Sequence, residues 1–465
     1  MPKQPASFAT DGGPIALVWR TLVDRFRTSL FGVPLLWLIG AILGAQLFTS
    51  LDRRESMQDL PDFLDTTVDN ARAILGAVSS GTISAASVVF SLTLVAIQMS
   101  STSYSSRVLR NLLRDRFQQH MIGIVTATFL YSLLVLREVG GRLEDGGNDA
   151  YLPRISVFLA VVFAVGAVLA LLASISHTAQ KLRVSTVIRD LSEEVMDLVS
   201  DRFAERSGDG AASKLAVGTV ALNDPELDDS EQLLDEGSAT VVTAPQSGWV
   251  QQISIEALES ASPASASIRI EAPVGSFVMR GAPLARLWSE TEVDKSDVET
   301  GLRAAFGLGD ERTMQQDVAL GLLVLEDVAV KALSPGINDP NTAKAVIHQL
   351  GAVIMDILER DLPPGRFSIG ECEIWSLAEP GYHDYVELAF DQIRIYARNQ
   401  GPVQLHMVRT LMTVRTELHR RNAATPEADA AIDQIIDAVI ADLSSPEQEQ
   451  GLYLRRAVSL IEARS

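Results

Sequence analysis

The sequence predicts a membrane protein with four transmembrane helices, followed by a cytoplasmic α+β part that combines a small β barrel-sandwich-like module with a helical bundle. Two observations support this fold class. The chain of 465 residues contains four apolar runs without charge in its N-terminal part, although its overall charged fraction is an ordinary 21%. Residues 1–190 carry 17 basic and 14 acidic side chains, whereas the remaining residues carry 22 and 45, so the second part is strongly acidic.

The four apolar runs have the length of membrane spans. A helix needs about 20 largely apolar residues to cross a hydrocarbon core of about 30 Å. Runs without Asp, Glu, Lys or Arg occupy residues 28–51, 73–106, 117–136 and 155–180. One such run could be a buried helix of a soluble protein, but four in succession favour membrane spans. We expect a transmembrane domain over 1–180, with spans at about 29–51, 72–100, 117–136 and 155–178.

The charges beside the spans predict their orientation. Basic residues dominate the N-terminal segment, the second loop and the segment after the fourth span, whereas the first and third loops are richer in acid. Because cytoplasmic loops carry the excess of Lys and Arg, both termini of this multi-pass protein are expected inside. The lone cysteine, Cys372, leaves no intramolecular disulfide, in agreement with a cytoplasmic second part.

The second span carries a polar stripe. At 100° per residue, five side chains fall within about 60° of one face and cover about 27 Å of the helix. They are Ser80, Ser84, Ser87, Ser91 and Gln98. Hydroxyls at such depth need a partner. They either lie in a packing seam of small residues and bond back to their own helix, or line a water-filled path around which copies of this helix assemble.

The loop after this span begins with a basic run that includes Arg107, Arg110 and Arg114. Rings of such arginines would favour anions at the inner mouth of a pore. The same residues also satisfy the positive-inside rule as solvated flanking charge. No acidic or basic residue lies deep within a span, which disfavours an ion-coupled transporter.

Beyond the spans the periodicity changes three times. A heptad-like apolar pattern predicts a helical stalk over 181–205, and an acidic, Gly-containing stretch predicts a linker over 206–237. Alternating apolar residues with glycines at turns predict the β module over 238–292. Its turn rhythm resembles that of biotinyl and lipoyl carriers, but no lysine lies between Lys214 and Lys295, so cofactor attachment is not expected. Helical periodicity predicts a helical domain over 300–465.

Between two long helical patterns of that domain stands the sequence LSPGINDPNTA, residues 333–343. Its turn residues are Ser334, Gly336, Asn338, Asp339 and Pro340. Asp339 can cap the second helix and Pro340 suits its first position, so the local chemistry predicts a capped helix–turn–helix. In the alternative, Asn338 and Asp339 present oxygen ligands or contact a neighbouring subunit.

Two segments resemble a known family. Residues 104–118, YSSRVLRNLLRDRFQ, together with residues 333–342, are similar to a bacterial membrane family catalogued as domain of unknown function 2254. The resemblance spans nearly the whole chain. The family's usual form has Phe-Ser-Pro-Arg where this chain has Tyr104-Ser105-Ser106-Arg107, which loses a proline. The resemblance implies a multi-pass protein of the bacterial inner (plasma) membrane and supplies neither an activity nor catalytic residues.

The sequence contains no recognisable catalytic constellation. Phosphate-loop, dinucleotide-binding and nucleophile-elbow motifs are absent, and the six histidines are scattered without ligand spacing. We therefore expect no enzymatic activity, no metal site and no cofactor, and the acidic second part argues against nucleic acid.

Three functions remain open. The first is a symmetric homo-oligomeric ion channel or pore, regulated by its cytoplasmic domain. The alternative is a non-conducting membrane scaffold or sensor whose acidic domain recruits a basic cytoplasmic partner. A transporter is the third and is disfavoured by the absence of charge within the spans.

Overall fold

The computed structural model describes residues 32–54, 66–103, 116–140, 151–181, 183–206, 219–221, 239–289, 295–376, 380–444 and 451–462. The chain divides into two compact units, residues 1–183 and 184–465, and each is described by itself. Arg107, Arg110 and Arg114, the basic residues expected at an inner mouth, lie outside the described residues.

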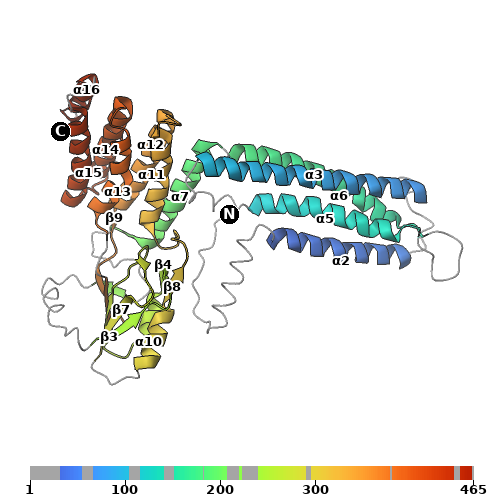
Figure 1. Cartoon of the computed structure of the whole chain (residues 1–465), viewed down its shortest axis with the longest axis horizontal. Coiled ribbons are helices and arrows are strands. Elements are labelled where there is room, and N and C mark those ends of the chain that lie inside the picture. Colours follow the sequence, from blue (N-terminus) through green and yellow to red (C-terminus); the bar gives the residue numbers. More distant parts are fainter. Residues whose placement is uncertain are drawn as a thin grey trace. The chain divides into compact units, whose positions relative to one another are not determined.

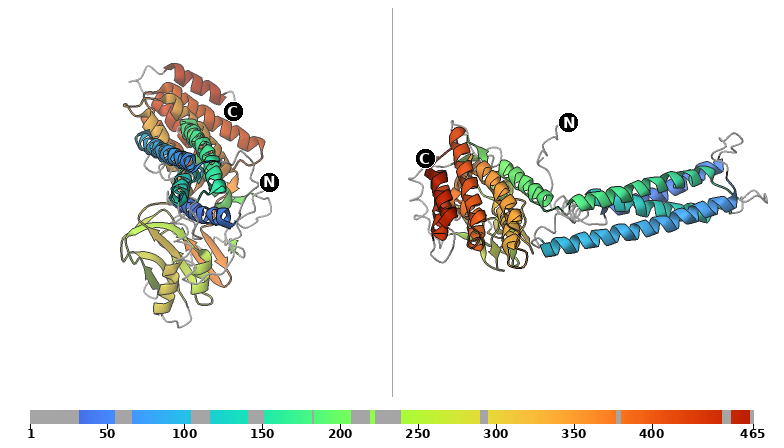
Figure 2. Two further views of the ribbon diagram at one scale, coloured as in Figure 1. Left: turned by 90° about the vertical axis from the view of Figure 1, so that its right-hand side faces the viewer. Right: turned by 90° about the horizontal axis from the view of Figure 1, so that it is seen from above.

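The first unit is a bundle of long helices, which run side by side in all views (Figures 1 and 2). They are α2 (Gly32–Arg54), α3 (Val68–Ser103), α5 (Arg116–Glu138) and α6 (Arg154–Lys181). Each contains a window long and apolar enough to cross a membrane, which confirms the prediction of four apolar helices. A helix satisfies its backbone polar groups within itself, as a hydrocarbon environment demands.

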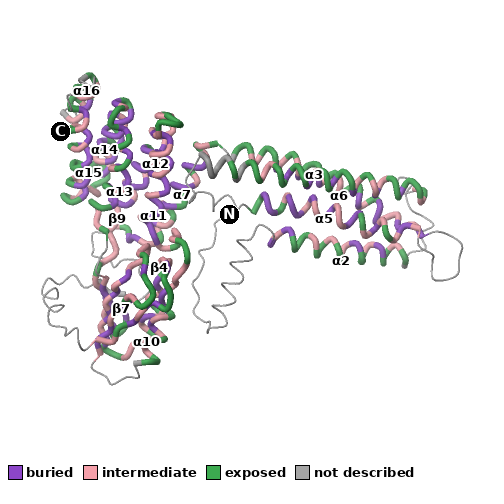
Figure 3. The backbone as a smooth tube through the Cα atoms, viewed as in Figure 1, coloured by how far each residue is buried: buried purple, intermediate pink, exposed green. Residues whose placement is uncertain are grey.

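Helix α5 is the centre of this bundle. It contacts α2, α3 and α6, and half of its apolar window is buried against 22–28% for the other three helices. Tyr131 and Val135 of α5 pack with Ala71 and Leu75 of α3 in one core cluster. The outward faces of α3 and α6 remain exposed within the chain, as Figure 3 shows for α3 in green.

One end of the bundle is fixed by polar contacts between helices. Asp52, near the end of α2, accepts hydrogen bonds from the backbone N–H groups of Ile155 and Ser156 at 3.1 and 3.0 Å. These are free N–H groups in the first turn of α6, so a side chain of one helix caps another. The hydroxyl of Tyr151 donates to the carbonyl of Thr49 at 2.8 Å. These hydrogen bonds therefore hold the end of α2 against Tyr151 and the start of α6.

The described residues of the second unit form three sheets, in which all strand pairs are antiparallel except β11–β5. The six-stranded sheet has the order β2-β10-β11-β5-β7-β3, the three-stranded sheet β6-β4-β8, and the two-stranded sheet β1-β9. The strands are β1 (Ala204–Glu205), β2 (Thr219–Ala221), β3 (Thr240–Thr243), β4 (Gly248–Ile253), β5 (Ser267–Ile270), β6 (Phe277–Val278), β7 (Pro283–Trp288), β8 (Phe306–Gly309), β9 (Arg360–Asp361), β10 (Arg366–Ile369) and β11 (Cys372–Ser376). Helices α9 (Ile255–Ala261) and α10 (Lys295–Ala304) place Leu258 and Leu302 in the core of these sheets.

The remaining helices of this unit form a bundle, with α11 to α15 arranged side by side (Figure 1). They are α11 (Val318–Leu333), α12 (Pro340–Leu358), α13 (Tyr382–Tyr396), α14 (Gly401–Arg420), α15 (Pro426–Leu443) and α16 (Gly451–Glu462). Helix α7 (Val184–Arg202), which covers most of the expected stalk, packs on α11 and α12 through an apolar face that includes Ile188, Leu191 and Val195.

The β architecture differs from the expected one in two ways. The described residues form open sheets and no closed barrel, because β10 and β11 extend the sheet beside β5. These two strands, with β8 and β9, lie in the region 300–465 that was expected to be helical. Their two to five residues are too few for a clear alternating pattern. Strand β2, within the expected linker 206–237, also joins this sheet through β10.

Candidate functional site

The polar stripe of the second span lies on the exposed face of α3. Ser80, Ser84, Ser87, Ser91 and Gln98 are all exposed within the chain. The opposite face of α3 is packed against α5 and α6 through side chains that include Leu75, Ala86 and Val89. The stripe therefore lies away from the face that α3 packs against α5 and α6, and its role in a pore or in a packing seam stays a prediction.

The hydroxyls of the stripe fall into two groups. Ser80 donates to the carbonyl of Gly76 at 2.9 Å, and Ser84 donates to the carbonyl of Ser80 at 2.8 Å. Such bonds to the preceding turn satisfy a hydroxyl in an apolar environment. The hydroxyls of Ser87 and Ser91 have no hydrogen-bond partner among the described residues. In a membrane these two groups need a partner, which can be water, another chain or, after rotation of the hydroxyl, a carbonyl of their own helix.

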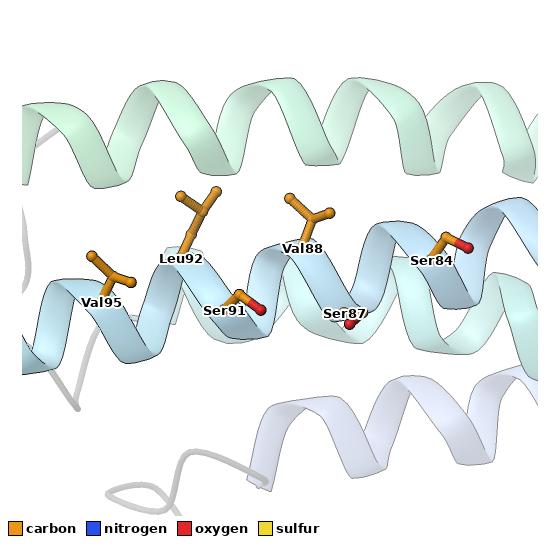
Figure 4. A pocket seen from close by; sticks show the side chains of 6 residues that line it. All are labelled: Ser84, Ser87, Val88, Ser91, Leu92 and Val95. Atoms are coloured by element: carbon orange, nitrogen blue, oxygen red, sulfur yellow. The ribbon is translucent and has the colours of Figure 1, made fainter.

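An open groove of about 440 Å³ runs along this face. Ser84, Ser87 and Ser91 line it together with Val88, Leu92 and Val95, and all six side chains belong to α3 (Figure 4). The groove is lined by one helix, and one wall is not enough to enclose a path. Chemically it offers hydroxyl oxygens and methyl groups without charge, which suits contact with water or with a second α3 helix.

A second polar cluster, which the sequence patterns did not single out, lies inside the same bundle. Gln118 of α5 donates to Thr93 of α3 at 2.9 Å and accepts from the hydroxyl of Ser174 of α6 at 3.0 Å. The neighbouring Gln119 is fully buried, and its amide has no hydrogen-bond partner among the described residues. The signal that could have revealed this cluster is the pair of adjacent glutamines at the start of a charge-free run. The hydrogen bonds of Gln118 therefore link α5 to both α3 and α6.

The turn of residues 333–343 has the predicted capped geometry. Helix α11 ends at Leu333, and Asp339 accepts from the N–H groups of Asn341 and Thr342 at 3.1 and 3.2 Å. Pro340 is the first residue of α12. Asn338 has a left-handed backbone with φ of 48°, and its side chain accepts from Gln400 at 3.3 Å, which joins this turn to the start of α14. Ser334 caps α11, and Gly336 is exposed.

Removing this cap tests its contribution to stability. Asp339→Ala deprives Asn341 and Thr342 of their acceptor, so the free energy of unfolding of the second unit should fall by about 0.5–2 kcal/mol at neutral pH. The bonds from Thr342 and Asn341 lower the pKa of Asp339. The stabilisation is therefore complete above the unfolded-state pKa and is lost as pH falls through the lower folded-state pKa.

Denaturant unfolding of the full chain measures this effect. The difference between the wild type and Asp339→Ala should shrink at about pH 3. Asp339→Asn is the control, because asparagine also caps helices and does not titrate. If Asp339→Asn were as unstable as Asp339→Ala at neutral pH, the hydrogen bonds of the side-chain cap would not be the source of the lost stability.

Comparisons with known proteins agree with the membrane character of the first unit. A family model described as "Predicted membrane protein (DUF2254)" matches residues 27–413. Uncharacterized proteins of Mycobacterium bovis and Mycobacterium tuberculosis are 28% identical over 385 residues, which is 80% of this chain and 68% of theirs. No solved structure matches the chain.

Proposed function

Because the chain belongs to the DUF2254 family of predicted membrane proteins, whose model matches residues 27–413, we propose that it is a homo-oligomeric ion channel of the bacterial inner membrane. In this proposal several copies of α3 surround a symmetry axis, and the stripe of Ser80, Ser84, Ser87, Ser91 and Gln98 faces the axis. The second unit regulates the channel from the cytoplasm. The protein catalyses no reaction.

The observation that carries this proposal is the combination of two faces on α3. One face is packed against α5 and α6, and the other presents Ser87 and Ser91 with free hydroxyls in the middle of a charge-free helix. Copies of α3 around an axis would give those hydroxyls water, whereas in a lipid-facing position they would have to bond back to their own helix, as Ser80 and Ser84 do. The basic residues Arg107, Arg110 and Arg114 follow α3 in sequence and would surround the inner mouth.

Regulation by the second unit is supported by its connection to the spans. Helix α7 begins at Val184, three residues after α6 ends at Lys181. The hydroxyl of its Ser192 donates to the side-chain oxygen of Gln349 of α12 at 3.0 Å, and its Val195 fills the space beside Gly321 of α11. A rearrangement of the second unit would therefore act directly on the helix that follows the last span.

The oligomeric state tests the proposal. In nanodiscs, mass photometry should find assemblies of at least three subunits, because fewer α3 helices cannot enclose a wet path. In proteoliposomes the same preparation should pass ions under voltage, tension or a pH step. A monomer without flux would leave the non-conducting scaffold, whose acidic unit recruits a basic partner, as the better account.

Cysteine accessibility tests the proposed orientation. Cysteines introduced at positions 58 and 147 should react with a membrane-impermeant reagent added outside sealed cells, whereas a cysteine at position 115 should not. The native Cys372 contributes little background, because burial raises the pKa of its thiol to about 11 and the thiolate is the reactive form. Labelling of position 115 from outside would overturn the orientation with both termini inside.

A further inference from the structure

Four basic side chains meet on the surface of the helical bundle. Lys344 and His348 lie one turn apart on α12, and His406 and Arg409 lie three residues apart on α14. The two histidine rings are edge to face, with centroids 4.3 Å apart. We call these four residues the basic patch. It joins residues that are about 60 positions apart in the sequence.

The close approach of the two helices explains why these side chains meet. Gly351 of α12 has no Cβ, and the methyl group of Thr410 occupies the space where one would lie. The helices thus touch one turn beyond the histidine pair. His348 and Arg409 are exposed, whereas Lys344 and His406 are half-buried. The patch is accessible from solvent, and its four side chains are anchored on rigid helices.

The positive charge of the patch is not neutralised. The unit as a whole is acidic, and other arginines of the bundle are paired with carboxylates: Arg360 with Asp356, Arg394 with Asp391 and Asp442, Arg415 with Asp433, Arg420 with Glu417, and Arg421 with Glu359. Lys344 and Arg409 form no ion pair with a carboxylate in the described part of the chain. Two cations without partners therefore share one surface in a unit with a large excess of acid.

The environment of His406 reports the same imbalance. Burial, followed by the neighbouring basic side chains His348, Lys344 and Arg409, lowers the pKa of His406 to about 4, and a hydrogen bond to the main chain of Lys344 acts in the opposite direction. The Nε2 atom of His406 is buried without a hydrogen-bond partner among the described residues. No carboxylate is among the groups that act on His406, so its surroundings carry an excess of positive charge.

We propose that the basic patch binds an anion through a phosphate group. The ammonium of Lys344, the guanidinium of Arg409 and the exposed imidazole of His348 offer donors from two helices, and a terminal phosphate offers three acceptor oxygens to them. A carboxylate has two oxygens and leaves more of these donors unmet. The phosphate group belongs either to a soluble phosphate compound or to a lipid headgroup.

The patch is well placed to influence the rest of the unit. Gln349, the residue after His348, accepts the hydrogen bond from Ser192 of α7 at 3.0 Å. An anion that draws α12 and α14 together would therefore act one residue away from the contact with the helix that follows the spans. This site lies outside α3, and its existence does not depend on channel activity.

Binding by the full-length protein tests the inference. Isothermal titration in detergent, at constant ionic strength set with chloride, would use inorganic pyrophosphate in one arm and short-chain phosphatidic acid in the other. The wild type should bind at least one probe, and the tighter probe identifies the soluble or lipid source. Lys344→Gln combined with Arg409→Gln should weaken that binding about tenfold or more, because charge-assisted bonds to phosphate are the strong ones.

A double variant with the same change in charge provides the control. Arg420→Gln with Arg421→Gln removes two cations from the other end of α14, where both are paired with carboxylates, and should leave the affinity unchanged. Failure of the wild type to bind either probe would overturn the inference. An equal loss of affinity in both double variants would also overturn it, because the net charge of the protein would then explain the loss without a specific site.

Discussion

Replacing Ser84, Ser87 and Ser91 together by leucine is expected to abolish ion flux while the protein remains folded and oligomeric. The three side chains are exposed within the chain, so larger residues at these positions should not disturb the bundle. Around an axis, rings of leucine would narrow the path and expel water, and a dewetted constriction blocks ions without closing sterically. A proteoliposome leak assay measures the loss.

The alternative role of the stripe predicts a different result. If α3 packed tightly against α3 of a second copy, leucine would overpack the seam at about 1–3 kcal/mol per site and disturb assembly. As a control, Val161, Val165 and Val168 of α6 are also exposed, and changing them to leucine should leave the flux intact. The single variant Ser87→Asp should be more permeable to cations, relative to anions, than the wild type. Assembled leucine variants that conduct normally would contradict a pore lined by this face.

Arg206→Ala should cause the largest loss of stability in the second unit. Arg206 follows β1 and donates to Asp361 at 3.1 Å, to the carbonyls of Arg360 and Ala423 at 3.0 and 2.7 Å, and to the hydroxyl of Tyr382 at 2.6 Å. Removing the guanidinium takes the donor away from the Asp361 carboxylate and the Ala423 carbonyl in a half-buried site, while the Arg360 carbonyl keeps the Tyr382 hydroxyl. We expect the free energy of unfolding to fall by about 3–5 kcal/mol.

Thermal unfolding followed by tryptophan fluorescence measures this loss. Three of the tryptophans, Trp249, Trp288 and Trp375, belong to the second unit, whose Tm should fall by roughly 5–15 °C. Arg189→Ala on α7 is the control, since its pairs with Asp190 and Glu193 are exposed and such pairs contribute at most about 1 kcal/mol. Equal Tm values for the two variants would show that the contacts of Arg206 add little.

Features encoded by neighbouring residues could be predicted from the sequence. Charge-free runs predicted the four apolar helices because a membrane imposes one simple composition on a long segment. The serine stripe could be assigned to one face of α3 because helical geometry is regular. The cap formed by Asp339 and Pro340 is likewise local, and the structure has the corresponding hydrogen bonds. In each case the necessary information lies within a few turns of chain.

Features that depend on distant residues could not be predicted. The acceptors of Arg206 lie 154 to 217 positions away, and no pattern near Arg206 marks it. Strands β10 and β11 are short, and their place beside β5 depends on the whole unit. In the sequence, His348 and His406 are far apart and show no common pattern. Only the packing of α12 against α14 brings their rings together. Such sites arise from tertiary contacts.

The accessibility of Ser87 to water is the most direct test of the proposed pore. Ser87→Cys and Leu169→Cys place a thiol on α3 and on α6 at positions that are both exposed within the chain. In proteoliposomes, a charged thiol reagent should modify Cys at position 87 and reduce the flux, because it travels through water, and should leave position 169 unmodified in the lipid. Equal protection of both positions would place the serine face against lipid or protein and contradict the pore.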